Sequence, residues 1–171
     1  MKCTQCGKSK GLFVKFYNGL CSNCLQRARY MQGKWFIINH LTGSYNPAKD
    51  AYKIMELNNL VSKIQEKIVP NVIAKSIDQA DVIITLSDVS KTIGHYSDGS
   101  IAERLDIRLE IKTKEEKILF DKTFYGAKPP DKIYKMLNER ANSVQGSVPT
   151  AAVLEYIDNL LRGINFMISD D

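Results

Sequence analysis

The chain has 171 residues, of which 44% are hydrophobic and 25% are charged, and its formal net charge is +5 at pH 7. This length suits one domain or a small module joined to a larger one, and the apolar content excludes a disordered low-complexity protein. The N-terminus has no apolar segment of the signal-peptide type, and apolar runs elsewhere are only a few residues long. We therefore expect a cytoplasmic protein without a secretion signal or a membrane span.

The charge is distributed unevenly along the chain. Residues 1–49 contain eight Lys or Arg and no Asp or Glu, which gives +8. Residues 50–171 hold the other 16 basic and all 19 acidic side chains, which gives −3. Such an asymmetry favours an anionic partner for the basic segment. The alternative is a small module that uses lysine only for solubility.

All four cysteines lie near the N-terminus, in two Cys-x2-Cys pairs with fourteen residues between the pairs: Cys3, Cys6, Cys21 and Cys24. Two such pairs can present four thiolates to one tetrahedral metal ion. Four thiolates leave no open position for water or substrate, so we expect one structural Zn²⁺ ion. A rubredoxin-like iron site would use the same ligands, and the lack of a secretion signal disfavours two disulfides.

The residues between and after the cysteine pairs predict how the site is built. Gly7 permits the tight turn of a zinc knuckle, residues 12–17 are typical of a strand, and Asn18-Gly19 is a preferred hairpin turn. No glycine follows Cys24, and the next residues have good helix propensity. A knuckle, a hairpin and a helix-borne second pair resemble the treble-clef zinc-finger family, over residues 1–33 only. The family is functionally diverse, so the resemblance implies a fold rather than an activity.

The remaining chain, residues 34–171, predicts a separate α+β domain. Residues 35–39 are typical of a short apolar strand. Asn46 and Pro47 are expected to be the N-cap and first residue of a helix that runs to Val69. Apolar residues recur along this helix every three or four positions and predict one buried stripe: Ile54, Leu57, Val61, Ile64 and Ile68.

After Pro70 the apolar period changes to two. Strands are predicted at residues 81–88, 105–111 and 117–125, and we expect them to form an antiparallel meander. Two more helices follow, a short one near residues 131–141 and a last one at 149–162 with Gly163 just beyond its end. The resulting fold class is α+β, with helices packed on one face of the sheet.

Basic and aromatic residues of the finger form a second candidate site. Cations on a small fold can neutralise phosphates, and an exposed ring can stack on a base. A protein partner is equally compatible with this surface, and Phe13, Phe16 and Tyr30 are expected to form the finger's own small core. No helix shows the base-reading arrangement of a C2H2 finger, so sequence-specific reading is not expected. The residues of this surface are Lys8, Lys10, Lys15, Tyr17, Arg27, Arg29 and Lys34.

The polar segment from Ser90 to Ser100 is a third candidate site. It contains His95, and a two-histidine metal centre would need His40, the only other histidine, to converge on it. We interpret the segment as a hairpin loop without chemistry, because Asp98-Gly99 is an ordinary turn signal.

No nucleotide-binding, nucleophile-elbow or zinc-protease motif is present. The sequence therefore predicts a non-enzymatic zinc-binding protein whose finger contacts nucleic acid or a protein partner. Two alternatives remain. One is an enzyme or a small-ligand-binding protein with its site in the α+β domain near His95. The other is a zinc-stabilised assembly protein that pairs subunits through the exposed edge of the meander.

Overall fold

The fold is seen in a computed structural model of the chain. It describes residues 2–3, 6–9, 15–17, 19–29, 31, 33–48, 50–68, 73–96, 99–129 and 143–168.

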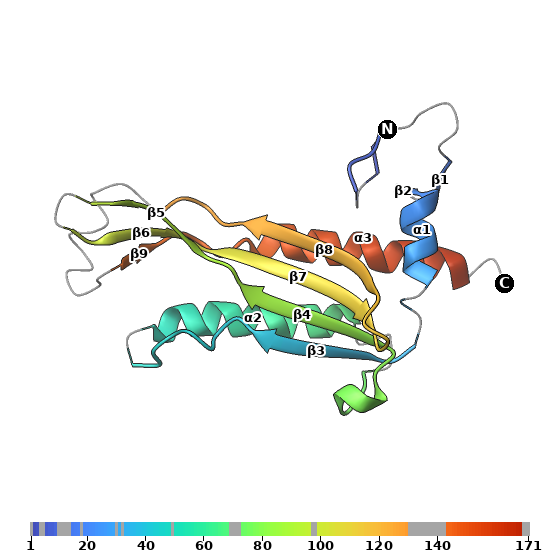
Figure 1. Ribbon diagram of the computed structural model, residues 1–171, viewed down its shortest axis with the longest axis horizontal. Coiled ribbons are helices and arrows are strands. Elements are labelled where there is room, and N and C mark those ends of the chain that lie inside the picture. The colour runs from blue at the N-terminus through green and yellow to red at the C-terminus, as the bar shows by residue number, and fades with distance from the viewer. Residues whose placement is uncertain are drawn as a thin grey trace.

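Four strands form the main sheet, in the spatial order β3–β4–β7–β8 (Figure 1). The strands β4 (Val82–Asp88), β7 (Asp106–Thr113) and β8 (Ile118–Tyr125) pair antiparallel, which confirms the predicted meander. The apolar strand β3 (Trp35–His40) joins β4 in parallel and forms one edge of the sheet. The sequence had left the place of this strand open.

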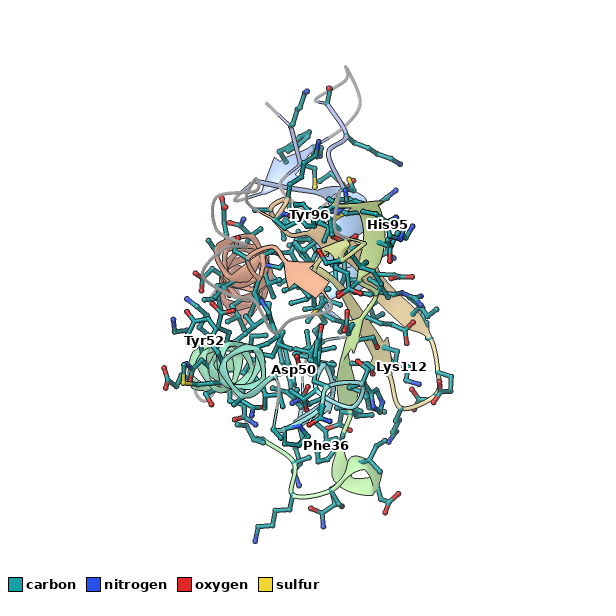
Figure 2. All side chains as sticks on the ribbon, turned by 90° about the vertical axis from the view of Figure 1, so that its left-hand side faces the viewer. Phe36, Asp50, Tyr52, His95, Tyr96 and Lys112 are labelled. Carbon is teal, nitrogen blue, oxygen red and sulfur yellow. The ribbon has the colours of Figure 1, made fainter. Side chains whose placement is uncertain are left out.

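Two long helices, α2 (Ala51–Ile68) and α3 (Thr150–Ile168), cover one face of the main sheet, as predicted for the α+β class (Figures 1 and 2). Alternate residues of the strands meet the stripe of α2, because strand side chains repeat with period two and helix side chains with period 3.6. Full burial of one such aliphatic side chain contributes about 1.5–3 kcal/mol. This main core includes Trp35, Leu57, Leu60, Ile64, Ile84, Leu86, Ile107, Leu109, Ile111, Phe124, Val153 and Ile157.

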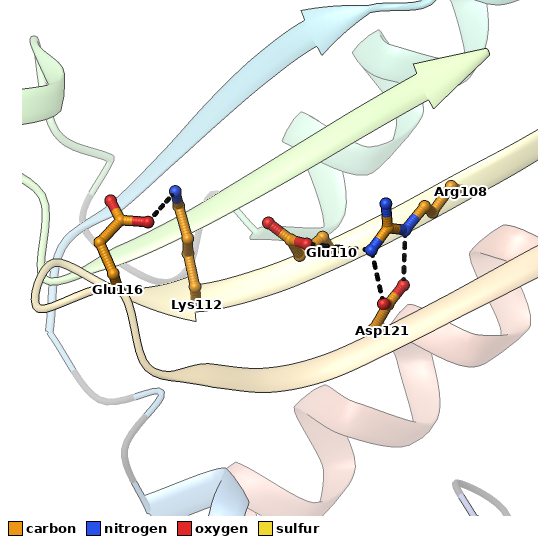
Figure 3. Close-up of polar contacts among 5 residues, drawn as sticks. All are labelled: Arg108, Glu110, Lys112, Glu116 and Asp121. Atoms are coloured by element: carbon orange, nitrogen blue, oxygen red, sulfur yellow. Dashed lines mark hydrogen bonds and ion pairs between the residues drawn. The ribbon is translucent and has the colours of Figure 1, made fainter. Parts of the chain in front are cut away.

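The opposite face of the sheet is largely polar over β7 and β8, whereas over β3 and β4 it carries a small apolar cluster around Ile83. Arg108 on β7 makes two hydrogen bonds with Asp121 on β8, at 2.8 and 2.7 Å, and Lys112 pairs with Glu116 in the following turn (Figure 3). Figure 2 shows Lys112 on the side of the sheet away from the helices. The alternation of apolar and charged residues in β7 therefore gave the correct two faces.

Strands β4 and β7 continue beyond the main sheet as the two arms of one long hairpin. Their pairing runs from Val82↔Thr113 to Asp88↔Ile107, and it resumes without an insertion at Lys91↔Arg104. The continuations are β5 (Lys91–His95) and β6 (Ile101–Arg104), to which β9 (Ser143–Gln145) adds in parallel. Five residues of the predicted loop from Ser90 to Ser100 are therefore strand, and the hairpin reverses only after His95.

A buried carboxylate lies where the hairpin passes from one sheet to the other. Asp106 is 1% exposed and accepts two hydrogen bonds of 2.8 Å from Arg104. Its Oδ1 atom also accepts a hydrogen bond from the backbone N–H of Gly126, at 3.3 Å. The Arg104 guanidinium lies 4.7 Å from the centre of the Tyr125 ring. Because a buried carboxylate needs such partners, these contacts fix the path of the chain at the bend.

The structure corrects two predicted helix ends. Helix α2 begins at Ala51 rather than at Pro47, because the backbone N–H of Asn46 donates to the Asp50 carboxylate and folds a turn before the helix. The carbonyl of Asp50 then accepts the hydrogen bond from Ile54. Helix α3 continues through Gly163 to Ile168, since the cost of one internal glycine, about 1 kcal/mol relative to Ala, does not end it. The predicted helix at 131–141 lies outside the described residues.

The N-terminal module consists of a short hairpin, β1 (Phe16–Tyr17) and β2 (Leu20–Cys21), followed by α1 (Ser22–Arg29). Helix α1 packs against α3 (Figure 1), and Met31, which follows α1, is fully buried in the main core. The module is thus in contact with the sheet-and-helix part, and the division after residue 33 stays a prediction. None of the described helices combines the length and apolar character needed to cross a membrane.

Candidate metal centre

The sulfur atoms of all four cysteines converge in the N-terminal module. The Sγ atoms of Cys3, Cys6, Cys21 and Cys24 lie within 4.8 Å of one another, and those of Cys6 and Cys21 are 3.6 Å apart. Four sulfurs at about 2.3 Å from a tetrahedral Zn²⁺ ion would be separated by about 3.8 Å. The four sulfurs are therefore close enough to one another to bind one metal ion.

The first cysteine pair lies on a tight turn. The backbone N–H of Gly7 donates to the carbonyl of Cys3 at 2.9 Å, and the N–H of Cys3 donates to the carbonyl of Lys8 at 2.8 Å. Gly7 has φ +71°, a left-handed value that a residue without Cβ adopts readily. The local sequence therefore folds as the predicted knuckle and directs Cys3 and Cys6 to the same point.

The second pair spans the junction between the hairpin and α1. Cys21 ends β2, and Cys24 lies in the first turn of α1, as the missing glycine predicted. The backbone N–H of Cys21 donates to Cys3 Sγ at 3.3 Å, so the second pair also orients a sulfur of the first. Gly19, with φ +83°, makes the turn between the two strands.

One of the four cysteines differs from the other three in its exposure to solvent. Cys3, Cys21 and Cys24 are 2%, 2% and 4% exposed, whereas Cys6 is exposed. The buried cysteines pack with Leu20 and with the partly buried Phe16 and Leu25. The cysteines are therefore a large part of the core that holds the module together. Of the rings predicted to form this core, Phe16 takes part, and Phe13 and Tyr30 lie outside the described residues.

Two of the four thiols, those of Cys6 and Cys24, have raised pKa values in the absence of a metal ion. Burial raises the pKa of the Cys24 thiol, and hydrogen bonds from neighbouring sulfurs add to this effect. Desolvation also raises the pKa of Cys6. The N-terminus of α1 favours the thiolate form of Cys24 electrostatically. In the absence of a metal ion, burial outweighs this effect. Because a metal ion binds thiolates, binding must release these protons and becomes stronger as pH rises.

The metal centre lies close to α3. Helix α1, which carries Cys24, contacts α3, which carries Tyr156, and burial raises the pKa of the Tyr156 hydroxyl. Tyr156 packs edge-to-face on Phe124 with 5.3 Å between ring centres, and Lys122 Nζ lies 4.6 Å from the centre of the Tyr156 ring. Sequence reasoning missed the contact between α1 and α3, because no local pattern indicates a contact between residues more than 100 positions apart.

Three residues of the predicted basic surface have described, exposed side chains. Lys8 lies on the knuckle and Lys15 precedes β1, so both belong to the metal module. Lys34 lies at the entrance to β3, where its backbone N–H donates to the Asp81 carboxylate at 2.9 Å. The side chains of the other members lie outside the described part: Lys10, Tyr17, Arg27 and Arg29.

The two histidines do not form a metal centre together. His40 pairs with Ser87 at the end of β3, and His95 ends β5, eight residues further along the hairpin. An extended strand of that length spans about 25 Å. Figure 1 shows β5 and β6 extending away from the main sheet. Within the part of the chain that the structure describes, the cysteine group is the one cluster of possible metal ligands.

Comparison with known proteins adds no relative. No family model matches this chain, and no curated protein matches it. The centre is therefore interpreted from its own geometry.

Proposed function

We propose that the chain is a non-enzymatic zinc-binding protein. One structural Zn²⁺ ion would be held by Cys3, Cys6, Cys21 and Cys24, and the module around it would contact nucleic acid or an acidic protein surface. The observation that carries the proposal is the convergence of four sulfurs within 4.8 Å of one another.

The chemistry of the ligands supports zinc in a structural role. Four thiolates are the ligand set of closed zinc sites, which have no position for water or substrate. Three of the four cysteines are also buried, as is usual for a site that stabilises a fold. The order of elements, a knuckle, the hairpin β1–β2 and then α1 with Cys24 in its first turn, supports a treble-clef-like arrangement.

The charge of the module supports an anionic partner. Residues 1–33 contain six Lys or Arg and no Asp or Glu, which gives +6, and a Zn²⁺ ion with four thiolates subtracts two, which leaves about +4. The exposed side chains of Lys8 and Lys15 lie on the metal module itself. A compact cationic module of this kind attracts phosphates or carboxylates at ordinary ionic strength.

Metal content tests the first part of the proposal. We expect one zinc ion per chain after purification without added metal, measured by elemental analysis and native mass spectrometry. Cys21→Ser should lose the ion, because a hydroxyl is a poor zinc ligand. A Cys6→Ser protein that keeps full zinc stoichiometry would contradict the four-cysteine assignment.

Binding at two salt concentrations tests the second part. Fluorescence anisotropy with labelled single-stranded RNA, duplex DNA and a poly-glutamate peptide should show binding that weakens as salt rises. For duplex DNA, Lys8→Ala and Lys15→Ala should each reduce the slope of log K against log salt by about one. Lys63→Ala is the matched control, since Lys63 is an exposed lysine on α2. Absence of salt-dependent binding to all three probes would exclude an anionic partner of these classes.

A further inference from the structure

The four sulfurs of the metal centre differ in their access to solvent. Cys6 is exposed, and the other three cysteines are at most 4% exposed. Leu20, which is 0% exposed, and the partly buried Phe16 and Leu25 pack around the buried sulfurs. A small water-soluble oxidant therefore meets the cluster first at Cys6.

The sulfur of Cys21 lies 3.6 Å from that of Cys6. A disulfide needs a sulfur–sulfur distance of about 2.05 Å, so the two atoms must approach by about 1.5 Å. The knuckle that carries Cys6 is at the surface, which allows this movement without opening the core of the module. Cys3 is as buried as Cys21, but it is a poorer partner because its sulfur already accepts the backbone N–H of Cys21 at 3.3 Å. A hydrogen bond to a thiolate stabilises its charge and lowers its nucleophilicity.

We propose that Cys6 is a site of oxidation by hydroperoxides and that Cys21 is its resolving partner, so that oxidation joins the two in a disulfide and releases the metal ion. The release of the ion rests on the zinc site proposed above, whereas the choice of the two sulfurs rests on the exposure of Cys6, on the 3.6 Å between the two atoms and on the hydrogen bond that Cys3 already accepts.

The reaction proceeds in two balanced steps. The Cys6 thiolate attacks one oxygen of the hydroperoxide, the O–O bond breaks, and the departing alkoxide or hydroxide takes a proton, leaving Cys6 as a sulfenic acid. The Cys21 thiolate then attacks the Cys6 sulfur, the S–S bond forms, and hydroxide leaves and is protonated to water. The two cysteines lose two electrons in total, and these reduce the hydroperoxide to water and an alcohol, or to two waters from hydrogen peroxide.

Loss of these ligands empties the site. Cys3 and Cys24 remain as the two unoxidised ligands, and two ligands do not complete the tetrahedral set that a structural zinc ion requires. A thiol reductant reverses the step by thiol–disulfide exchange, after which the four cysteines can bind the ion again. The metal module would thus lose and regain its fold with the supply of hydroperoxide and thiol.

Peptide mapping of the wild-type chain tests the proposal. The reduced, zinc-loaded full chain is treated with less than one equivalent of hydrogen peroxide, released zinc is followed with a colorimetric chelator, and the cysteines are mapped after differential alkylation. We expect one zinc released per disulfide formed, and that disulfide to join Cys6 to Cys21. Disulfides within a Cys-x2-Cys pair, first modification of Cys3 or Cys24, or no oxidation at all would overturn the proposal.

The zinc content of the purified chain distinguishes a failure of the oxidation proposal from a failure of the proposed zinc site. If the purified chain holds no zinc, the proposed metal function fails. The same mapping on the reduced metal-free chain still decides whether Cys6 and Cys21 form the disulfide.

Two histidine variants sharpen the result, because histidine is a zinc ligand that peroxide does not convert to a disulfide. Cys6→His should retain the ion and slow its release by peroxide at least about tenfold. Cys21→His should stop the reaction at the Cys6 sulfenic acid, which dimedone traps. Release from Cys6→His at the wild-type rate would overturn the assignment. If either variant fails to bind zinc, the wild-type mapping still decides.

Discussion

The indole Nε1 of Trp35 donates a hydrogen bond of 2.6 Å to the backbone carbonyl of Met31. Met31 and Trp35 are 0% and 2% exposed, and both belong to the main core. Met31 follows the helix of the metal module, and Trp35 is the first residue of β3. This bond therefore ties the chain leaving the metal module to the edge of the main sheet.

Replacing Trp35 tests how much this junction contributes to stability. Trp35→Phe leaves the Met31 carbonyl without its donor and leaves part of the indole volume empty. Each loss is costly in a buried place, and together they should lower the free energy of unfolding by about 2–4 kcal/mol. The measurement is urea denaturation followed by circular dichroism. Tyr52→Phe is the control, because Tyr52 is 70% exposed on α2 and points outward (Figure 2). Equal unfolding midpoints for the two variants would show that the junction contributes nothing.

Removal of the metal ion should change the fluorescence of Trp35 at the same junction. Trp35 is the single tryptophan of the chain, so its fluorescence reports the surroundings of Met31. Cys21→Ser, or a zinc chelator, should unfold residues 1–33 and shift Trp35 emission to longer wavelength, because folding of such a module is coupled to metal binding. Circular dichroism should retain the signal of α2, α3 and the main sheet. Unchanged emission after complete metal loss would mean that Met31 stays docked without the ion.

The features that sequence analysis predicted correctly depend on local chemistry. Two Cys-x2-Cys pairs specify a metal site wherever the intervening chain can turn, and Gly7 and Gly19 supply the left-handed turns with φ +71° and +83°. The strand β7 was predictable for a similar reason, since its apolar residues alternate with charged ones and one face meets the helices. In each case neighbouring residues carry the whole signal.

The features that sequence analysis missed depend on distant contacts. The parallel pairing of β3 with β4 joins Trp35 to Val82, and a six-residue apolar strand does not specify its neighbour. Strand β5 lacks an alternating pattern because its side chains are exposed or half-buried. Its pairing continues that of the long hairpin as far as Thr92, after which the register shifts by one residue. The contact of α1 with α3 likewise has no local signature.

A close backbone crossing near the bend of the hairpin makes Gly126 difficult to replace. A Cβ atom on Gly126 would lie 2.3 Å from the Leu105 carbonyl oxygen and 2.6 Å from that of Ser147. Both neighbours are backbone atoms, so Gly126→Ala should lower the free energy of unfolding by about 1–3 kcal/mol. Gly43→Ala is the control, because a Cβ there meets no atom within 4 Å, and its effect should stay within about 0.5 kcal/mol. Thermal unfolding measures the stability of both variants. Equal shifts of the unfolding temperature would contradict the close approach of the backbone at Gly126.

The ion pair between Arg108 and Asp121 on the open face of the sheet predicts a pH effect (Figure 3). Hydrogen bonds from Arg108 hold the pKa of Asp121 below its ordinary value. Since the folded-state pKa is the lower one, the pair stabilises the fold above the unfolded-state pKa of Asp, about 3.9. That stabilisation is lost as pH falls through the folded-state pKa. Both side chains are substantially exposed, so salt should weaken the effect.

Arg108→Gln should raise the pKa of Asp121 toward its ordinary value, because the amide cannot supply the charged donors that favour the carboxylate. The measurement is the pH dependence of the Asp121 side-chain carboxyl carbon shift by NMR. Lys63→Gln removes the same charge from the exposed surface of α2 and should leave that titration unchanged. The stability difference between wild type and Arg108→Gln should shrink toward zero in acid, as protonated Asp121 no longer distinguishes the two chains. An Asp121 titration that is identical in wild type and Arg108→Gln would show that the pair does not persist in solution.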